Sequence, residues 1–197
     1  APADYNGSET FVVSVNDGEL SDSQSFTVTV NAVNDAPQAT QGITGTTNED
    51  QSVVITLSGS DVDGDNLTFG LGYEPENGTV SVDGSFATYT PNSDFNGNDS
   101  FSFYVSDGDL AEGAVVTLTV NAVNDAPVLA AVSDVSFDED GSGSISLEAT
   151  DVDEDNLTYS ITEGTDIVAS LDGSSVTFSA PADYNGSETF VVSVNDG

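Results

Sequence analysis

Apolar and polar residues alternate along much of this chain, which is the pattern of β-strands that bury one face. Phe101, Phe103 and Val105 occupy alternate positions. The same spacing of apolar residues returns at 116–120 and at 26–30. No segment combines the period of 3.6 residues with the capping residues of a helix. The sequence therefore predicts an all-β protein.

One stretch of about 90 residues contains a full series of such strands. We predict strands near 40–46, 52–58, 66–72, 79–82, 85–90, 99–106 and 114–121. Asp83-Gly84 is expected to form a hairpin turn between the fifth strand and the one before it, because the left-handed conformation costs little at such a dipeptide. Seven short strands in a stretch of this length are typical of a Greek-key β-sandwich.

Two long motifs recur in the sequence at a spacing of 90 residues. The segment 31–37, Asn-Ala-Val-Asn-Asp-Ala-Pro, returns unchanged at 121–127. The acidic segment 61–68 returns at 151–158 with a single change, Gly64 to Glu154. A period of this length is that of one sandwich domain and is too long for one turn of a solenoid. The sequence therefore predicts tandem β-sandwich repeats.

The positions at which these motifs recur divide the chain into three parts. Residues 1–35 are predicted to be the C-terminal part of one repeat, 36–125 a complete repeat, and 126–197 a repeat that lacks its last strand. Residues 1–18 are identical to 180–197. We expect the chain to be a portion of a longer periodic array.

The charge of the chain is one-sided, with 35 Asp and Glu and no Lys, Arg or His, which gives a formal net charge of −35. No carboxylate can form an ion pair with a basic side chain, so dissolved or bound cations must screen the repulsion. Binding to nucleic acid or to an anionic membrane is excluded, because both depend on basic residues. No apolar run approaches the ~20 residues of a membrane-spanning helix. The chain has no Cys, which is consistent with a secreted bacterial protein, and we expect an extracellular or cell-surface location.

The same composition restricts the chemistry. Without His and Cys, zinc, copper and haem sites lack their usual ligands, and Ser-His or Cys-His nucleophiles cannot form. Paired carboxylates remain, and such pairs hydrolyse glycosides in some enzymes. Here, however, the acids recur in register at repeat boundaries and do not gather in one unique place. We expect no enzymatic activity.

Asp-x-Asp-x-Asp-Asn, at 61–66 and 151–156, is the strongest candidate for a metal site. Three carboxylates within five residues repel one another unless water or a hard cation bridges them, and Ca²⁺ takes 6–8 oxygen ligands. The loop Gly and terminal Glu of an EF-hand are absent. A solvated turn is the alternative, because Asp and Asn favour turns in any case.

Two further acidic segments recur. The motif at 31–37 and 121–127 lies between repeats, where Pro restricts the backbone and makes the linker stiff, and its oxygens could ligate an ion. It could equally be a plain polar linker. Glu49-Asp50 and Glu139-Asp140 lie early in their repeats, where exposed loop acids are the alternative.

Together these motifs resemble the cadherin-like repeats of large bacterial surface proteins. Asp151-Val152-Asp153 resembles the cadherin Asp-x-Asp, Val194-Asn195-Asp196 resembles the Ala-x-Asp, and Glu49 and Glu139 resemble the early Glu. The linker at 120–127 resembles Asp-x-Asn-Asp-Asn-Ala-Pro. The resemblance covers the whole chain and implies seven-stranded sandwiches of the cadherin or immunoglobulin type.

The sequence also departs from the cadherin pattern. Asn121 and Val123 replace an Asp and an Asn of the linker, and Asn124-Asp125 reverses the usual order. The Asp-Arg-Glu motif is absent, and Asp94-Phe95-Asn96-Gly97 is the segment near its place. These changes leave the number of ions per junction open.

The resemblance implies Ca²⁺ at the junctions between repeats. The implied ligands of the junction at 35/36 are Asp4, Asn31, Asn34 and Asp35, then Asp61, Asp63 and Asp107. Those of the junction at 125/126 are Glu49, Asp94, Asn121, Asn124 and Asp125, then Asp151, Asp153 and Asp196, while Glu139 is the early Glu of the last repeat.

The leading functional hypothesis is a structural or adhesive module, stiffened by calcium into a rod or surface filament, with neighbouring repeats and other copies as partners. A second is a binding module for polysaccharide, a cell surface or another cadherin-like domain, for which Tyr73 and Tyr104 are the aromatic residues outside the core pattern. A third is strand donation, because residues 19–35 contain the strand that 126–197 lacks. In a longer array the following chain would supply that strand.

Overall fold

The structure is a computed structural model that describes residues 2–197, and these residues form β-strands joined by turns and loops. The chain divides into two compact units, the first ending at Ala122 and the second comprising Val123–Gly197. Within the described part of the chain, no helix is long and apolar enough to cross a membrane. The repeat boundaries at 35/36 and 125/126 stay a prediction.

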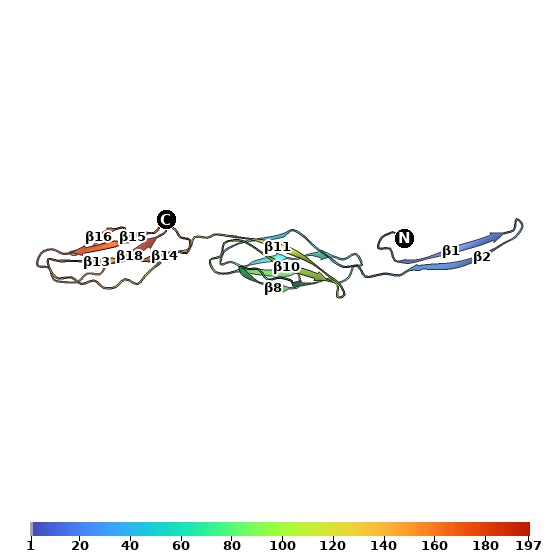
Figure 1. Ribbon diagram of the computed structural model, residues 1–197, viewed down its shortest axis with the longest axis horizontal. Helices are drawn as coiled ribbons and strands as arrows, with labels where there is room; N and C mark the ends of the chain where they lie inside the picture. The colour runs from blue at the N-terminus through green and yellow to red at the C-terminus, as the bar shows by residue number, and fades with distance from the viewer. Residues whose placement is uncertain (1) are drawn as a thin grey trace. The chain divides into compact units, whose positions relative to one another are not determined.

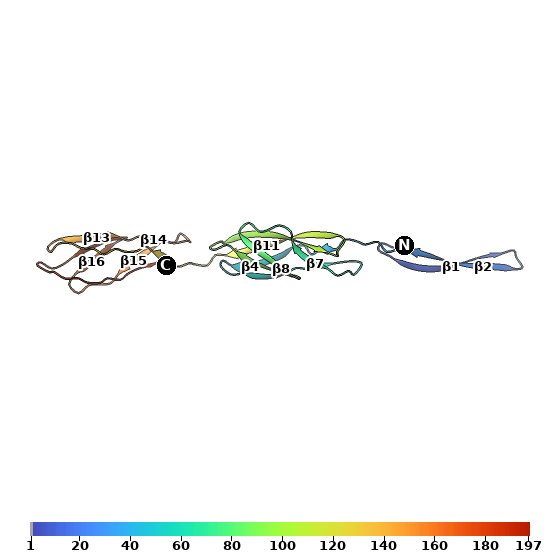
Figure 2. The same cartoon turned by 90° about the horizontal axis from the view of Figure 1, so that it is seen from below.

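The first unit contains a sandwich of two sheets (Figures 1 and 2). One sheet has the strand order β4 (Ile43–Asn48), β11 (Ala111–Asn121), β10 (Gly97–Ser106) and β7 (Thr68–Leu71). The other has the order β5 (Val53–Thr56), β9 (Phe86–Pro91) and β8 (Gly78–Asp83), and a short pair joins β3 (Gln38–Ala39) to β6 (Gly59–Ser60). β4 runs parallel to β11, whereas β10 is antiparallel to both of its neighbours. The predicted all-β Greek-key sandwich is confirmed.

The core of this sandwich follows the alternation of the sequence. Phe101, Phe103 and Val105 of β10 are at most 2% exposed, and the alternate residues Val116, Leu118 and Val120 of β11 are buried beside them. Tyr89 of the opposite sheet is fully buried in the same core. Because successive side chains of a strand point to opposite faces, the polar residues between them face outward. The expected hairpin turn is also present: Asp83 pairs with Phe86.

The first predicted strand, 40–46, is wrong at its start. The chain forms the short strand β3 at Gln38–Ala39, leaves it at Thr40, and enters β4 only at Ile43. Gly42 lies between them with φ 74°, a left-handed conformation that interrupts an extended strand. The break allows β3 to pair with β6 while β4 pairs with β11.

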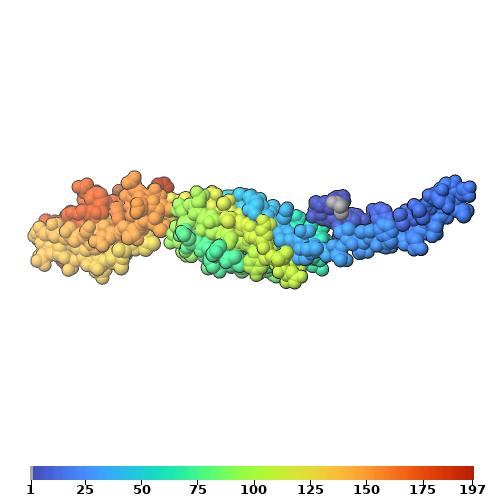
Figure 3. Space-filling model, turned by 45° about the vertical axis from the view of Figure 1, so that its right-hand side comes forward, coloured from blue at the N-terminus to red at the C-terminus, as the bar shows by residue number. Residues whose placement is uncertain are grey.

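The first unit begins with a hairpin of β1 (Gly7–Asn16) and β2 (Ser21–Val30), in which Phe11 lies opposite Phe26. Its apolar residues occupy the same alternate positions as those of β10 and β11. Yet Val13 is 59% exposed, whereas its counterpart Phe103 is 1% exposed. The space-filling view shows the hairpin, in blue, as a narrow ribbon without a second layer of its own (Figure 3).

The second unit repeats the order of elements of the sandwich. Its strands are β12 (Val128–Leu129), β13 (Ser142–Ser146), β14 (Ala149–Thr150), β15 (Thr158–Ile161), β16 (Val168–Asp172), β17 (Ser175–Ser179) and β18 (Val192–Asn195). β13, β17 and β16 form one sheet, β15 pairs with β18, and β12 pairs with β14. Its buried core is small and consists of Leu147, Val176 and Phe178. In the described part of this unit, β18 has β15 as its sole paired neighbour, so one edge of β18 is open.

Candidate metal centre

The loop that follows β6 is folded around one carboxylate, that of Asp61. Its Oδ1 accepts hydrogen bonds from the backbone N–H groups of Asp63 at 2.8 Å, Gly64 at 3.1 Å and Asp65 at 3.4 Å. Gly64 has φ 81°, which lets the chain turn back within this span. The sequence Asp-x-Asp-Gly-Asp therefore produces a tight acidic turn without any basic residue.

This turn gathers three carboxylates. One oxygen from each of Asp61, Asp63 and Asp65 lies within 4.8 Å of the others. The second oxygen of Asp61, Oδ2, is shielded from solvent and accepts no hydrogen bond from the described residues. A shielded carboxylate oxygen without a donor is costly, because its lost hydration is not replaced. Oxygen ligands from several carboxylates are the set that Ca²⁺ binds, so the turn fits a calcium ion.

The linker between repeats is hydrogen-bonded to the domain that follows it. The backbone N–H of Asp35 donates to Asp63 Oδ2 at 2.8 Å, and Asn34 Nδ2 donates to Asp107 Oδ2 at 3.0 Å. The pKa of Asp107 is lowered, first by the N–H of Leu110 and then by the Asn34 side chain. The two linker residues thus contact two loops that are far apart in the sequence.

The second unit contains the same acidic turn. Asp151 Oδ1 accepts the N–H groups of Asp153 at 3.0 Å and Asp155 at 3.3 Å. The three carboxylates again lie within 4.8 Å of one another, and Asp151 Oδ2 is shielded and accepts no hydrogen bond from the described residues. Glu154 takes the left-handed position that Gly64 holds in the first turn, with φ 62°.

The linker contacts recur with it. The N–H of Asp125 donates to Asp153 Oδ2 at 2.7 Å, and Asn124 Nδ2 donates to Asp196 Oδ2 at 2.8 Å. Two copies of one arrangement, formed from different residues in two units, show that the arrangement belongs to the repeat.

Other predicted ligands lie where β4 and β11 end, in the first unit. Asn121 Nδ2 donates to Asn48 Oδ1 at 3.1 Å, and the Asn121 carbonyl accepts the N–H of Glu49 at 3.0 Å. The N–H of Asp94 lies 3.4 Å from Asp50 Oδ1. The roles of Glu49, Asp94 and Asn121 as ligands stay predictions.

Three predicted ligands join neither acidic turn among the described residues. Asp4 precedes β1 with φ 57°, Asn31 follows β2, and Glu139 lies in the turn before β13. Two residues that the predicted ligand set omitted, Asp65 and Asp155, are members of the carboxylate clusters. Their signal was present in the sequence as the third Asp of each repeated motif.

Comparisons with known proteins agree with the fold. The family model for the bacterial Ig domain matches residues 34–121 and 124–197. The chain belongs to the bacterial Ig domain family. No curated protein matches it.

Solved structures with related folds include cadherins. Cadherin domains 1–4 of protocadherin gamma B7 match with 14% identity and a TM-score of 0.55, over 96% of this chain and 54% of that one. Human protocadherin-24 domains 1–2 match with 20% identity and a TM-score of 0.49, over 75% of this chain and 80% of that one. The predicted cadherin-like character of the repeats is confirmed at the level of the fold.

An endo-fucoidan hydrolase of glycoside hydrolase family 107 matches with 18% identity and a TM-score of 0.37, over 99% of this chain. The chain spans 33% of the length of that enzyme.

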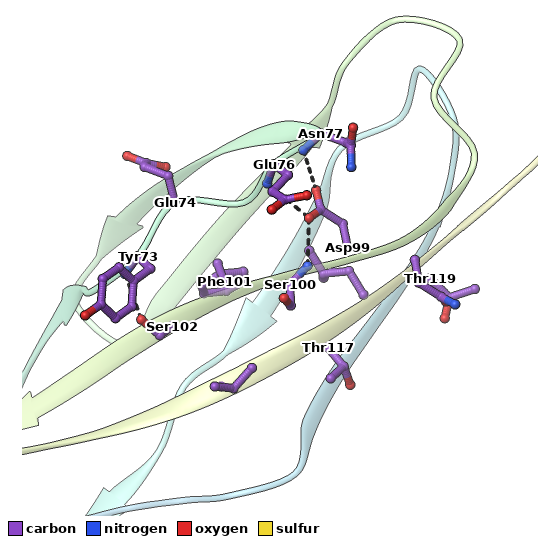
Figure 4. A pocket seen from close by; sticks show the side chains of 13 residues that line it. Tyr73, Glu74, Glu76, Asn77, Asp99, Ser100, Phe101, Ser102, Thr117 and Thr119 are labelled. Carbon is purple, nitrogen blue, oxygen red and sulfur yellow. Dashed lines mark hydrogen bonds between the residues drawn. The ribbon is translucent and has the colours of Figure 1, made fainter.

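The bacterial Ig domain of the first unit also has a groove of about 680 Å³ on the sheet of β10 and β11 (Figure 4). Tyr73 lies at the groove and is 81% exposed. Asp99 closes it at one end, where its carboxylate accepts the N–H groups of Glu76 at 3.2 Å and Asn77 at 3.0 Å. The buried hydroxyl of Tyr89 donates to the same carboxylate at 3.0 Å. Asp99 therefore fastens a loop to the sandwich.

The second aromatic candidate, Tyr104, has a structural partner. It lies opposite Gly70 on β7, and a Cβ atom at Gly70 would lie 2.3 Å from the Tyr104 ring. The ring thus covers a glycine in the neighbouring strand, although it is 43% exposed. Of the two residues, Tyr73 is the better candidate for ligand contact.

Proposed function

We propose that these bacterial Ig domains form a non-catalytic extracellular spacer, in which calcium bound at the junctions stiffens a string of repeats into a rod or surface filament. The observation that supports this most directly is the acidic turn hydrogen-bonded to the preceding linker, present twice in the chain. The family and the cadherin-like fold are consistent with such a role.

The choice of calcium in this proposal rests on the chemistry of the ligands. All side chains in each acidic turn offer oxygen, and the chain contains no His or Cys, so a soft or borderline metal lacks nitrogen and sulfur ligands. Mg²⁺ requires a nearly ideal octahedron, whereas Ca²⁺ tolerates the irregular geometry that clustered carboxylates produce. Extracellular calcium sites bind at ~10⁻⁴–10⁻³ M, a range in which the ion stabilises a domain without being permanently bound.

Stiffening would act through the linker. Asn34 and Asp35 follow β2 after only a few residues, and both are hydrogen-bonded to the domain that comes next. Without an ion, the repulsion between Asp61 and Asp63 loosens the turn that holds Asp35. A bound ion removes that repulsion and fixes the turn, and the linker with it. In this proposal the residues implied by the cadherin resemblance, Asp4, Asn31, Glu49, Asp94 and Asn121, supply further ligands from the preceding repeat.

A thermal melt of the whole chain tests the proposal, first in chelator, then in millimolar Ca²⁺, with Mg²⁺ at matched ionic strength as the control. The expected result is a rise in melting temperature with Ca²⁺ that Mg²⁺ does not reproduce, because a ligand that binds the folded state raises its stability. Small-angle scattering under the same conditions should show a larger radius of gyration and a larger maximum dimension with Ca²⁺, because a stiff rod does not sample bent conformations. Equal rises with both ions would mean general screening of the negative charge, and the calcium sites would be abandoned.

A second candidate function is recognition of a neutral polysaccharide at the groove beside Tyr73. An exposed aromatic side chain next to hydroxyl and carboxylate groups offers both stacking and hydrogen bonds to a sugar. Replacement of Tyr73 by Ala should abolish binding on a glycan array, while replacement of Tyr104 by Ala should not. If neither variant nor the native chain retains any glycan, this function is excluded.

A further inference from the structure

An early strand and the last strand of the sandwich in the first unit lie side by side and run in the same direction. β4 pairs with β11 in parallel register, from Ile43 opposite Val116 to Asn48 opposite Asn121. The contact continues past the end of β4, where the N–H of Glu49 donates to the Asn121 carbonyl at 3.0 Å. The segments by which the chain enters and leaves this domain are therefore bonded directly to each other.

Side chains extend the same contact in the other direction, beyond the start of β4. The carboxylate of Glu112 on β11 accepts the N–H of Ala39 at 3.1 Å, and Gln41 Nε2 donates to the carbonyl of Gly113 at 3.3 Å. These bonds bridge the break between β3 and β4. The early segment is thus bonded to β11 from one end of that strand to the other.

Tension along the chain reaches this pair of strands from opposite ends. The chain enters the domain before β4 and leaves it at Ala122, directly after β11. Because the two strands are parallel, tension draws β4 toward its start and β11 toward its end, and the strands are pulled past each other. All hydrogen bonds between them then resist the force together, whereas strands pulled from the same end lose their bonds one at a time.

The packing of β4 against the core prevents it from sliding along β11. A Cβ atom at Gly45 would lie 2.9 Å from side-chain atoms of Ile55 and of Leu118, both of which are buried. Tension draws the next residue on the same face, Thr47, toward this place, because side chains two positions apart in a strand share a face. A branched side chain cannot enter the space of a glycine without displacing the core around it. The register of the pair is therefore fixed against the direction of the pull.

We propose that the parallel pair of β4 and β11 is a mechanical clamp, by which this domain bears tension along the chain before it unfolds. The clamp depends on the pairing of the two strands and on the fit of Gly45 in the core, and it needs no bound ion. The proposed calcium sites act on the linkers, whereas the clamp acts inside the domain. The function that follows is that of a tether, a chain held at both ends against flow or traction.

Single-molecule force spectroscopy of the whole chain in chelator tests this proposal. The native chain has no Cys, so pairs of introduced Cys residues can hold the handles at chosen positions. Handles at Val33→Cys and Ala122→Cys apply tension in the direction in which the chain itself would. Full unfolding between them releases about 300 Å of extended chain, which identifies the event.

The control keeps every contact of the pair and changes only the direction of the force. Handles at Val33→Cys and Asp109→Cys pull on the same end of β4 and of β11, because Asp109 lies just before β11. This geometry peels the strands apart. The force at which the domain unfolds should be severalfold higher between Val33 and Ala122 than between Val33 and Asp109.

Two proline variants of β4 test the hydrogen bonds. The N–H groups of successive residues in a strand point to opposite sides within the sheet. Since the N–H of Glu49 donates to β11, that of Thr47 points to β11 and that of Thr46 points away. β4 is an edge strand among the described strands, and an edge accepts Pro where its N–H faces solvent. Thr47→Pro should strongly lower the unfolding force between Val33 and Ala122, and the matched control Thr46→Pro should lower it little.

Equal unfolding forces in the two directions would overturn the proposal. So would a Thr47→Pro chain that melts cooperatively and still resists the Val33–Ala122 pull as strongly as the native chain. If Thr47→Pro does not fold, the comparison of the two directions decides. All of these measurements are made in chelator, so their outcome does not depend on the calcium sites of the proposed function.

Discussion

Replacement of Asp61 by Asn should have opposite effects with and without calcium. The Asn side chain keeps Oδ1, which accepts the three N–H groups that fold the turn. It replaces the shielded Oδ2, which has no donor among the described residues, by an NH₂ group that can donate to Asp63 or Asp65. One negative charge leaves the cluster, and one calcium ligand leaves with it.

The magnitudes follow from the cluster. Two unit charges about 4 Å apart in water interact by about 1 kcal/mol, and Asp61 faces two other carboxylates within 4.8 Å. In chelator the substitution should therefore stabilise the domain by about 1–2 kcal/mol, before salt screening reduces it. With calcium at about 10 to 100 times its Kd, the native domain gains about 1.4–2.7 kcal/mol, most of which the variant should lose.

Calorimetric melts in chelator and in calcium measure both effects, since about 1 kcal/mol shifts the melting temperature of a domain this size by about 4–8 °C. Asp83→Asn is the matched control, because it removes the same charge from the exposed β8–β9 turn of the same domain. The Asp83→Asn domain should keep the full rise in melting temperature that calcium causes. The reasoning would be refuted if the Asp61→Asn domain melted at a lower temperature than the native domain in chelator and still showed the full rise in melting temperature with calcium.

Three further predictions concern single contacts. Tyr89→Phe removes the hydrogen bond to the Asp99 carboxylate and should cost about 1.5–3 kcal/mol in urea denaturation. Burial, with Asp99 adding to it, raises the pKa of Tyr89. The contribution of this tyrosine to the free energy of unfolding is therefore complete below pH 10 and is lost as the pH rises through the raised pKa. Asn34→Ala should raise the pKa of Asp107 toward 3.8, a change that NMR titration measures. In the native chain, the lowered pKa of Asp107 contributes to the free energy of unfolding above pH 3.8, and this contribution is lost as the pH falls through the pKa of the folded state. Glu154→Gly should stabilise the second unit by about 1 kcal/mol in urea denaturation, because its φ is 62°.

Each of these has a control. Tyr73→Phe alters an exposed ring and should leave stability unchanged. Asn31→Ala should not move the pKa of Asp107, so an equal shift in both Asn variants would contradict a direct contact. Glu154→Ala removes the carboxylate but keeps the left-handed backbone, so a gain as large as that of Glu154→Gly would show that charge, and not backbone strain, is responsible.

Alternation in the sequence was sufficient to predict the sandwich, because strands with one buried face repeat every second residue, as Phe101 and Phe103 do. The acidic turns were equally visible, since the spacing of Asp61, Asp63 and Asp65 is local and recurs. The break at Gly42 was not predicted, because a single glycine in a polar stretch is compatible with several conformations.

Long-range contacts left a weaker signal. Asp99 binds the backbone of residues 76 and 77, and nothing in the sequence connects these positions. Residues 7–16 form a strand along their whole length, whereas the identical sequence at 186–195 is strand only at Val192–Asn195. Local sequence could not predict this difference at all, because the two segments differ only in their neighbours.

The hydrogen bonds from each linker to the following domain define where a repeat can be cut without damage. A protease that cleaves between Val33 and Asn34 leaves the downstream domain with its full set of contacts, whereas cleavage after Asp35 removes both linker residues that it holds. The same holds for gene duplication: the segment that can be copied intact begins at Asn34 or Asn124 and not at the Pro that follows. The linker residues that lead into a domain therefore belong structurally to that domain.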